Sequence, residues 1–203
     1  GRSIKMGNRA DVTPGDALTF QSYDRPWANV SNAPFRMFKH YVHEGGISTP
    51  LIAHWPKGFA QQGSQHAACH VVDILPTILE VTGVTAIGEL GETEVQSVQG
   101  ESLLPLLKGR DWQREQPIFF EHEGNRALRM GRFKLVRQHG MNWELYDMEL
   151  DRTELRNLAA GASDQVRDMA HMYEAWAHDT GVIAWDRVLP KLLKAWNMAS
   201  VDG

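Results

Sequence analysis

The sequence predicts an α/β protein that ends in an antiparallel sheet with one helix packed against it. Three observations carry this prediction. An unbroken apolar run at Leu51–Trp55 precedes an amphipathic stretch at 73–82, and a strand followed by a helix is typical of α/β layers. After Pro117, four short apolar runs are separated by glycine-containing turns, which is typical of an antiparallel meander. A helical pattern then follows Ser163.

The composition is that of a folded protein, and it excludes several classes of function. Of 203 residues, 42% are hydrophobic and 23% charged, a balance typical of globular domains. No apolar run approaches the roughly 20 residues of a membrane-spanning helix. The formal net charge of −4 gives no overall attraction to nucleic acid. We therefore expect no membrane span and no nucleic-acid partner. The single cysteine fits a cytoplasmic and a periplasmic or secreted protein equally.

Residues 1–34 follow neither the strand period nor the helix period. Turn-forming residues at 13–16 and 24–26 interrupt them. An irregular stretch of this length is unusual as a connection within a compact domain. We expect it to be a functional loop or part of a larger folded body.

The α/β part contains a strand and two helices. Leu51–Trp55 shows no alternation with polar residues, which predicts a buried strand. Asp73 is a candidate N-cap and Gly83 a candidate stop for a helix over 73–82. A further short apolar helix is expected within 100–109.

The C-terminal part predicts a meander of four strands, at 117–122, 126–130, 133–137 and 143–147. A helix follows that is capped by Ser163 or Asp164 and ends before Gly181, with one apolar face. We place a domain boundary in the polar stretch near residue 110. This gives an α/β part at 1–110 and a β-meander subdomain with its packing helix at 111–203.

Lys39 is the first candidate functional residue. It precedes a Glu-Gly-Gly turn at 44–46 that leads into the expected strand, so it would lie at the rim of a sheet, where ligands of α/β proteins often bind. An ammonium group there can neutralise an oxyanion. The residues alone favour the alternative, a solvent-exposed surface lysine.

His40, His43 and Glu44 form the pattern His-x-x-His-Glu, whose residue types suit a metal ion. The zincin motif needs two histidines one helical turn apart and its glutamate in a different place. We therefore expect no metal ligation by these three residues. Glu44 is expected to be structural, with its carboxylate accepting hydrogen bonds from turn amides.

His122 and Cys69 are the remaining candidates. His122 lies at a strand end beside a Gly-Asn turn, where an imidazole can serve as an acid, a base or a donor to an anion. A hydrogen bond within the turn is the favoured alternative. Cys69 is adjacent to His70, but sequence neighbours point apart and catalytic triads assemble across a fold. We expect Cys69 to be a small buried thiol.

Several segments taken together resemble the sulfatase family, in particular the C-terminal part of arylsulfatases. Lys39, five residues before Glu44, and the Thr49–Pro56 run look like the second conserved block of that family. The resemblance covers residues 13–180. The other matching segments are 32–36, 72–79, 121–127 and 143–147.

The resemblance implies an alkaline-phosphatase-like fold, present here in part, and the hydrolysis of sulfate esters. Sulfatases use a formylglycine made from a Cys or Ser in a C/S-x-P/A-x-R motif, together with a calcium ion held by Asp and Asn side chains. By position, Lys39 matches the lysine that contacts the sulfate group, which implies a catalytic and substrate-binding role. No other catalytic residue is carried over, and His122 stays a candidate for substrate binding.

The sequence departs from the family by lacking the nucleophile motif and the calcium-binding block. The residues after Cys69 do not fit the modification motif. We therefore expect the C-terminal fragment of a sulfatase, inactive alone, whose parent uses calcium and formylglycine while the fragment holds no metal and no cofactor. Its expected partners are a sulfate ester in the parent, and a missing N-terminal segment or a second copy. The alternatives are a phosphoesterase or phosphonate hydrolase of the same superfamily, and a non-catalytic binding or scaffold remnant.

Overall fold

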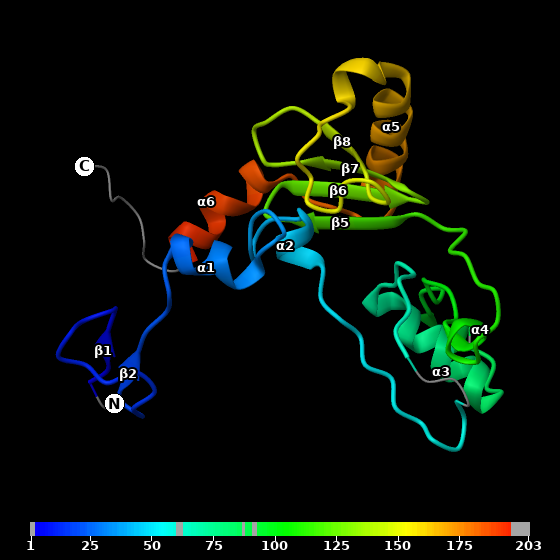
Figure 1. The fold of residues 1–203 in the computed structure, drawn as a ribbon, viewed down its shortest axis with the longest axis horizontal. Coiled ribbons are helices and arrows are strands. Elements are labelled where there is room, and N and C mark those ends of the chain that lie inside the picture. Colours follow the sequence, from blue (N-terminus) through cyan, green and yellow to red (C-terminus); the bar gives the residue numbers. More distant parts are fainter. Residues whose placement is uncertain (1–2, 60–62, 87, 91–92, 196–203) are drawn as a thin grey trace. The chain divides into compact units, whose positions relative to one another are not determined.

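The computed structural model describes residues 3–59, 63–86, 88–90 and 93–195 (Figure 1). The chain forms two compact units. The first comprises residues 1–48, 120–127 and 133–203, and the second comprises 49–119 and 128–132. The domain boundary near residue 110 stays a prediction.

A four-stranded meander, in the order β5-β6-β7-β8, confirms the predicted sheet. Strands β7 and β8 are antiparallel, with Lys134 opposite Tyr146. The two-residue turn between β5 and β6 has left-handed backbone at Glu123 (φ 52°) and Gly124 (φ 82°), as a tight hairpin turn requires. The strands are β5 (Ile118–His122), β6 (Asn125–Met130), β7 (Phe133–Arg137) and β8 (Glu144–Asp147).

Helix α5 (Ser163–Asp179) confirms the predicted packing helix and lies against β7 of the sheet (Figure 1). It buries three side chains, Met169, Tyr173 and Ala177. Its predicted cap is wrong. Ala162 occupies the N-cap position, so no side chain caps the helix, and Ser163 is already its first residue.

A segment at 42–47 covers one face of the sheet and contributes to the buried core. Val42 packs with sheet residues, and Ile47 lies at the edge of the same cluster. Because side chains alternate along a strand, Lys134 and Val136 of β7 point to this face, while Leu135 points to the other. The core cluster comprises Val42, Ala127, Val136, Tyr146 and Met148.

The first 34 residues are only partly irregular. Strand β1 (Lys5–Met6) pairs in parallel with β2 (Thr19–Phe20). Helix α1 (Arg25–Asn32) was not predicted, because Pro26 was interpreted as a breaker. Pro26 lies in the first turn, where a helix has no use for the missing N–H.

Two short elements and one longer helix complete the first unit. They are α2 (Glu44–Ile47), the 3₁₀ turn η2 (Ala159–Gly161) and α6 (Trp185–Ala195), the last of which was not predicted. Within the described part of the chain, no helix is both long and apolar enough to cross a membrane.

The second unit contains the predicted helix α3 (Ile74–Thr82), which ends at Gly83 with a left-handed φ of 69°. Asp73 occupies the predicted N-cap position, but its side chain makes no capping hydrogen bond to α3. The Asp73 carboxylate is fully buried, accepts hydrogen bonds from the backbone N–H groups of His70 and Glu101, and pairs with Arg114. The other elements are η1 (Val71–Asp73), β3 (Glu89–Leu90), β4 (Thr93–Glu94) and α4 (Leu104–Leu107), the last as predicted.

The prediction of a buried strand at Leu51–Trp55 is wrong for this structure. The segment is irregular and Ile52 is 87% exposed. A strand is stable only when its backbone groups pair with a neighbour. Among the described residues, no segment pairs with this one.

Candidate functional site

Lys39 lies in a turn closed by a hydrogen bond from Tyr41 N–H to the Phe38 carbonyl, and its side chain is exposed. Within the described ranges it has no hydrogen-bond or ion-pair partner. The backbone on both sides is left-handed, at Met37 (φ 65°) and His40 (φ 104°). Such conformations cost about 1–3 kcal/mol each and persist only where surrounding contacts hold them.

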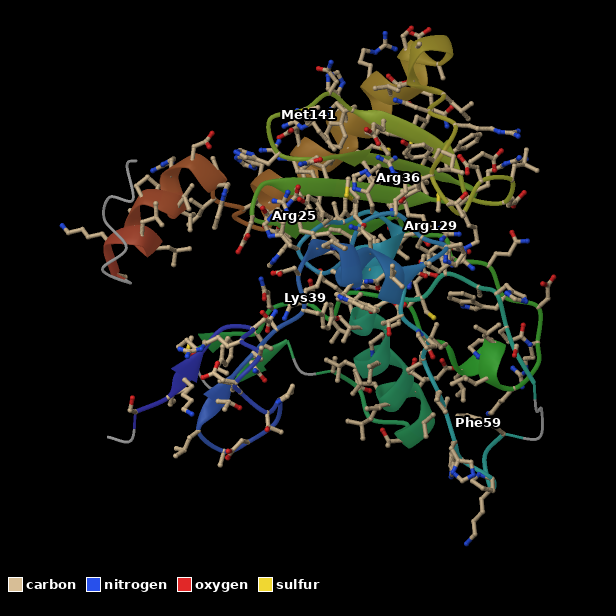
Figure 2. The ribbon with its side chains drawn as sticks, turned by 60° about the vertical axis from the view of Figure 1, so that its left-hand side comes forward. Arg25, Arg36, Lys39, Phe59, Arg129 and Met141 are labelled. Carbon is tan, nitrogen blue, oxygen red and sulfur yellow. The ribbon has the colours of Figure 1, made fainter. Side chains whose placement is uncertain are left out.

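Lys39 belongs to the segment 36–46, and Arg36 anchors the N-terminal end of this segment on the sheet (Figure 2). Its Nη1 donates to the Tyr146 hydroxyl at 2.8 Å and to the Glu154 carbonyl oxygen at 2.8 Å, and lies 3.4 Å from a Glu144 carboxylate oxygen. Burial alone would lower the pKa of Arg36, but the negative charge of its neighbours outweighs burial and raises it overall. The guanidinium therefore stays charged and holds the segment.

His43, 2% exposed, provides a second anchor. Its Nε2 lies 3.2 Å from the Glu144 carboxylate oxygen that also accepts a 2.7 Å hydrogen bond from the Tyr146 hydroxyl. The hydrogen bond with His43 is the largest cause that lowers the pKa of Glu144 to about 2, and the Tyr146 hydroxyl and the Arg36 charge add to it against the effect of burial. Glu144 is thus an anion that binds two sides of the same segment.

Glu44 belongs to a buried ion cluster. Its carboxylate lies 2.9 Å from Lys134 Nζ, which also lies 2.8 Å from the Glu154 carboxylate. The backbone N–H of Glu44 donates to a carboxylate oxygen of Glu154 at 2.9 Å, and Arg152 Nη2 lies 3.4 Å from the second carboxylate oxygen of Glu44. The structural role expected of Glu44 is confirmed, with the cations of Lys134 and Arg152 as partners of its carboxylate. The buried ammonium of Lys134 is the stronger partner in the low-dielectric interior.

Gly45 and Gly46 allow the chain to turn back closely on itself. Gly45 N–H donates to the Arg36 carbonyl at 2.8 Å. A Cβ atom on Gly45 would overlap the carbonyl oxygens of Arg36 and Met37, and one on Gly46 would overlap the Tyr41 carbonyl. The two glycines therefore allow the chain after Lys39 to fold back against the backbone of residues 36, 37 and 41.

His122 lies beside this segment, although the sequence gives no sign that the two meet. The His122 and His40 rings are 5.6 Å apart in an edge-on arrangement. The Asn125 amide donates to the backbone carbonyls of His40, at 3.2 Å, and His122, at 3.0 Å. The backbone carbonyl of His122 therefore accepts the hydrogen bond that was expected within the turn. The exposed imidazole ring stays available to a ligand.

The residues of the His-x-x-His-Glu pattern lie within this segment but do not form a metal site with one another. His40, His43 and Glu44 have separate partners, so they do not converge on one ion. Cys69 lies in the second unit and is exposed, so the prediction of a buried thiol is wrong. Partial desolvation and the Asp73 carboxylate raise the pKa of its thiol, which makes it a poor nucleophile.

The resemblance implies a calcium ion in the parent protein, and calcium takes six to eight oxygen ligands. The described residues offer no carboxylate cluster of that kind. Their converging group of metal-ligating side chains is His40, His122 and Glu123, with a single carboxylate.

Comparison with known proteins identifies the family. A family model described as N-sulphoglucosamine sulphohydrolase, C-terminal, matches residues 35–175. The chain belongs to the sulfatase family. The match includes Lys39, the anchored segment and the whole sheet, and it confirms the resemblance inferred from the sequence.

Two curated sulfatases are similar to this chain. An uncharacterized sulfatase of Schizosaccharomyces pombe is 30% identical over 184 residues, which cover 83% of this chain and 32% of that protein. The N-acetylglucosamine-6-O-sulfatase of Bacteroides thetaiotaomicron is 31% identical over 137 residues, covering 59% and 23%. This sulfatase chain thus spans about a third or less of the length of these relatives.

A solved structure supports the fold. The crystal structure of Ps i-CgsB matches 84% of this chain and 38% of its own, with a TM-score of 0.62 and 21% sequence identity. The prediction of a partial alkaline-phosphatase-like fold with a C-terminal antiparallel sheet is confirmed.

Proposed function

We propose that this sulfatase chain is the part of a sulfate-ester hydrolase that presents Lys39 to the sulfate group. The observation that carries the proposal is that the segment 36–46 is anchored at both ends while the Lys39 side chain between the anchors is exposed. The segment is anchored at Arg36, His43 and Glu44 by buried or half-buried groups, while the ammonium between the anchors is left exposed. Lys39 also matches, by position, the sulfate-contacting lysine of the family.

A fixed ammonium suits this reaction. A sulfate ester carries a negative charge, and charge develops further on its oxygens as the bond to the leaving alcohol breaks. A positive group that is already in place stabilises this charge without the cost of reorganising at the moment of reaction. The contacts at both ends of the segment supply that preorganisation.

His122 is proposed as a second contact to the substrate. Its ring is exposed and lies next to His40, the residue after Lys39. An imidazole N–H at this place can donate to an oxygen of the ester or of the alcohol that it carries.

The test uses the gene product that contains this chain, assayed with aryl and sugar sulfates and with a phosphate monoester. We expect hydrolysis of sulfate esters. We expect Lys39→Ala to lower kcat/KM about 10²–10³-fold, as loss of one charge-stabilising donor does, with partial rescue by Lys39→Arg. Lys57→Ala removes an equally exposed lysine and should change nothing.

Two results would contradict the proposal. One is unchanged kinetics in the Lys39→Ala variant, and the other is hydrolysis of the phosphate ester alone. The 203-residue chain by itself is expected to show no turnover, because it supplies neither nucleophile motif nor calcium ligands. Robust turnover by the isolated chain would place the nucleophile within it and overturn this division of roles.

A further inference from the structure

Three potential metal ligands converge at the hairpin between β5 and β6. One ligand atom from each of His40, His122 and Glu123 lies within 4.8 Å of the other two. His40 Nδ1 lies 2.6 Å from a Glu123 carboxylate oxygen. The residues come from two segments about 80 positions apart in the sequence, so no local motif indicates them.

The backbone beneath this group is rigid. Asn125, 1% exposed, donates from one amide nitrogen to the carbonyls of His40 and His122, and its oxygen accepts from His139 N–H at 3.1 Å. His40 and Glu123 both have left-handed backbone, at 104° and 52°. The three Cα positions are thus held, while the side chains of His40 and Glu123 remain 44% and 34% exposed and can rotate.

We infer that His40, His122 and Glu123 bind an exchangeable transition-metal ion of the Zn²⁺ class. Two imidazole nitrogens and one carboxylate oxygen form a donor set of zinc sites that keep the fourth position open, whereas calcium and magnesium prefer oxygen alone. Bonds of about 2.0–2.2 Å place tetrahedral ligand atoms roughly 3.4 Å apart. The His40–Glu123 pair at 2.6 Å must therefore open slightly, and wider separations within the 4.8 Å group must close. Rotation of the exposed side chains supplies this movement.

The Zn²⁺ site goes beyond the proposed sulfate-ester hydrolysis and shares one residue with it, His122. An ion bound to the His122 ring would present its open coordination position to a substrate oxygen in place of the imidazole N–H. One of its ligands, His40, is the residue after Lys39. Zinc binding can therefore fail while the role of Lys39 stands, and the reverse also holds.

The experiment titrates the chain with Zn²⁺ by calorimetry and with Co²⁺ by visible absorption. Cys69→Ser serves as the background, because the exposed thiol is itself a zinc ligand. We expect one equivalent of Zn²⁺, a tetrahedral Co²⁺ spectrum and a rise in melting temperature with added Zn²⁺. We expect His40→Ala, His122→Ala and Glu123→Gln each to weaken Zn²⁺ binding at least tenfold.

The matched control is His178→Ala, which removes an exposed histidine that is paired with Asp179 on α5 and should leave the affinity unchanged. Circular dichroism of each variant shows that loss of binding is not loss of fold. The inference is overturned by absence of stoichiometric Zn²⁺ binding. It is equally overturned by binding that survives in all three variants or that falls as much in the control.

Discussion

Lys134 lies in the interior of the first unit between two carboxylates, those of Glu44 and Glu154, and none of the lysine or of Glu154 is exposed to solvent. A buried ammonium is unfavourable unless it is paired. Here the pairing also ties a segment near the N-terminus to strand β7. Its role is therefore to keep the segment that carries Lys39 on the sheet.

We expect Lys134→Met to destabilise the chain by about 3–5 kcal/mol, because it leaves two buried carboxylates without their shared cation. Urea unfolding followed by circular dichroism measures this. Lys108→Met, at an exposed position, is the control and should stay within about 0.5 kcal/mol. An equally small effect at position 134 would show that Arg152 alone suffices.

Glu144 makes the stability of the chain depend on pH. Its pKa of about 2 in the folded chain lies below the ordinary value of 4.5, chiefly because of the hydrogen bond with His43. The folded state therefore gains stability above pH 4.5 and loses it as pH falls towards 2. We expect Glu144→Gln to remove roughly 1–3 kcal/mol of this acid-dependent stability.

Unfolding free energies measured at several pH values between 2 and 6 test this prediction. The difference between the parent chain and Glu144→Gln should shrink as the pH approaches 2. Glu115→Gln, at an exposed position, should leave a constant difference near zero. A pH-independent gap for Glu144→Gln would mean that the carboxylate charge is not what stabilises the fold.

At the scale of elements, the turn before and within α2 depends on Gly45. We expect Gly45→Ala to cost about 1–3 kcal/mol, because its Cβ would overlap the backbone of residues 36 and 37. Gly161→Ala is the matched control, since no atom lies near its would-be Cβ and its φ is ordinary. That change should be neutral or slightly stabilising. Thermal unfolding compares the two variants, and equal melting temperatures would contradict the close-approach argument.

A helix or strand is predicted correctly from this sequence when the element that it packs against is close to it along the chain. The meander and α5 were predicted correctly because each strand pairs with the next one along the chain and one helix face covers them. Leu51–Trp55 was predicted as a strand from its apolar run. Such a run indicates a tendency to be buried, but it does not indicate which strand would pair with it. Helix α6 was missed because Pro190 interrupts its pattern.

Of the candidate site, the sequence indicated His122 and the segment that carries Lys39 and the two glycines. The short spacing within that segment is local and resembles a family motif. The segment is held by Glu144 and Glu154, which lie more than 100 residues further along the chain. Nothing in their local sequence distinguishes them from ordinary surface carboxylates. Pairing over such a separation leaves no local pattern in a single sequence.

At the scale of the whole molecule, helix α3 leaves an apolar face uncovered. Ile74, Leu75 and Ile78 are 43–52% exposed, and none of the helix residues is buried. Exposed apolar faces of this kind mark surfaces that another polypeptide covers.

We therefore expect the isolated chain to self-associate as its concentration rises, because a second copy can cover the same face. Sedimentation velocity over a range of concentrations measures this. Ile78→Glu should reduce the association, since a charge on the face is costly to bury. A strictly monomeric chain at all concentrations would contradict the prediction.

The ion pairs around Glu44 have a consequence for synthesis of the protein. The partners of this residue are 90 and 110 positions further along the chain, so they emerge from the ribosome long after the segment that needs them. Until translation passes Glu154, the segment that carries Lys39 lacks part of its anchoring contacts. Its docking therefore waits for pairings that are distant in the sequence, which form slowly.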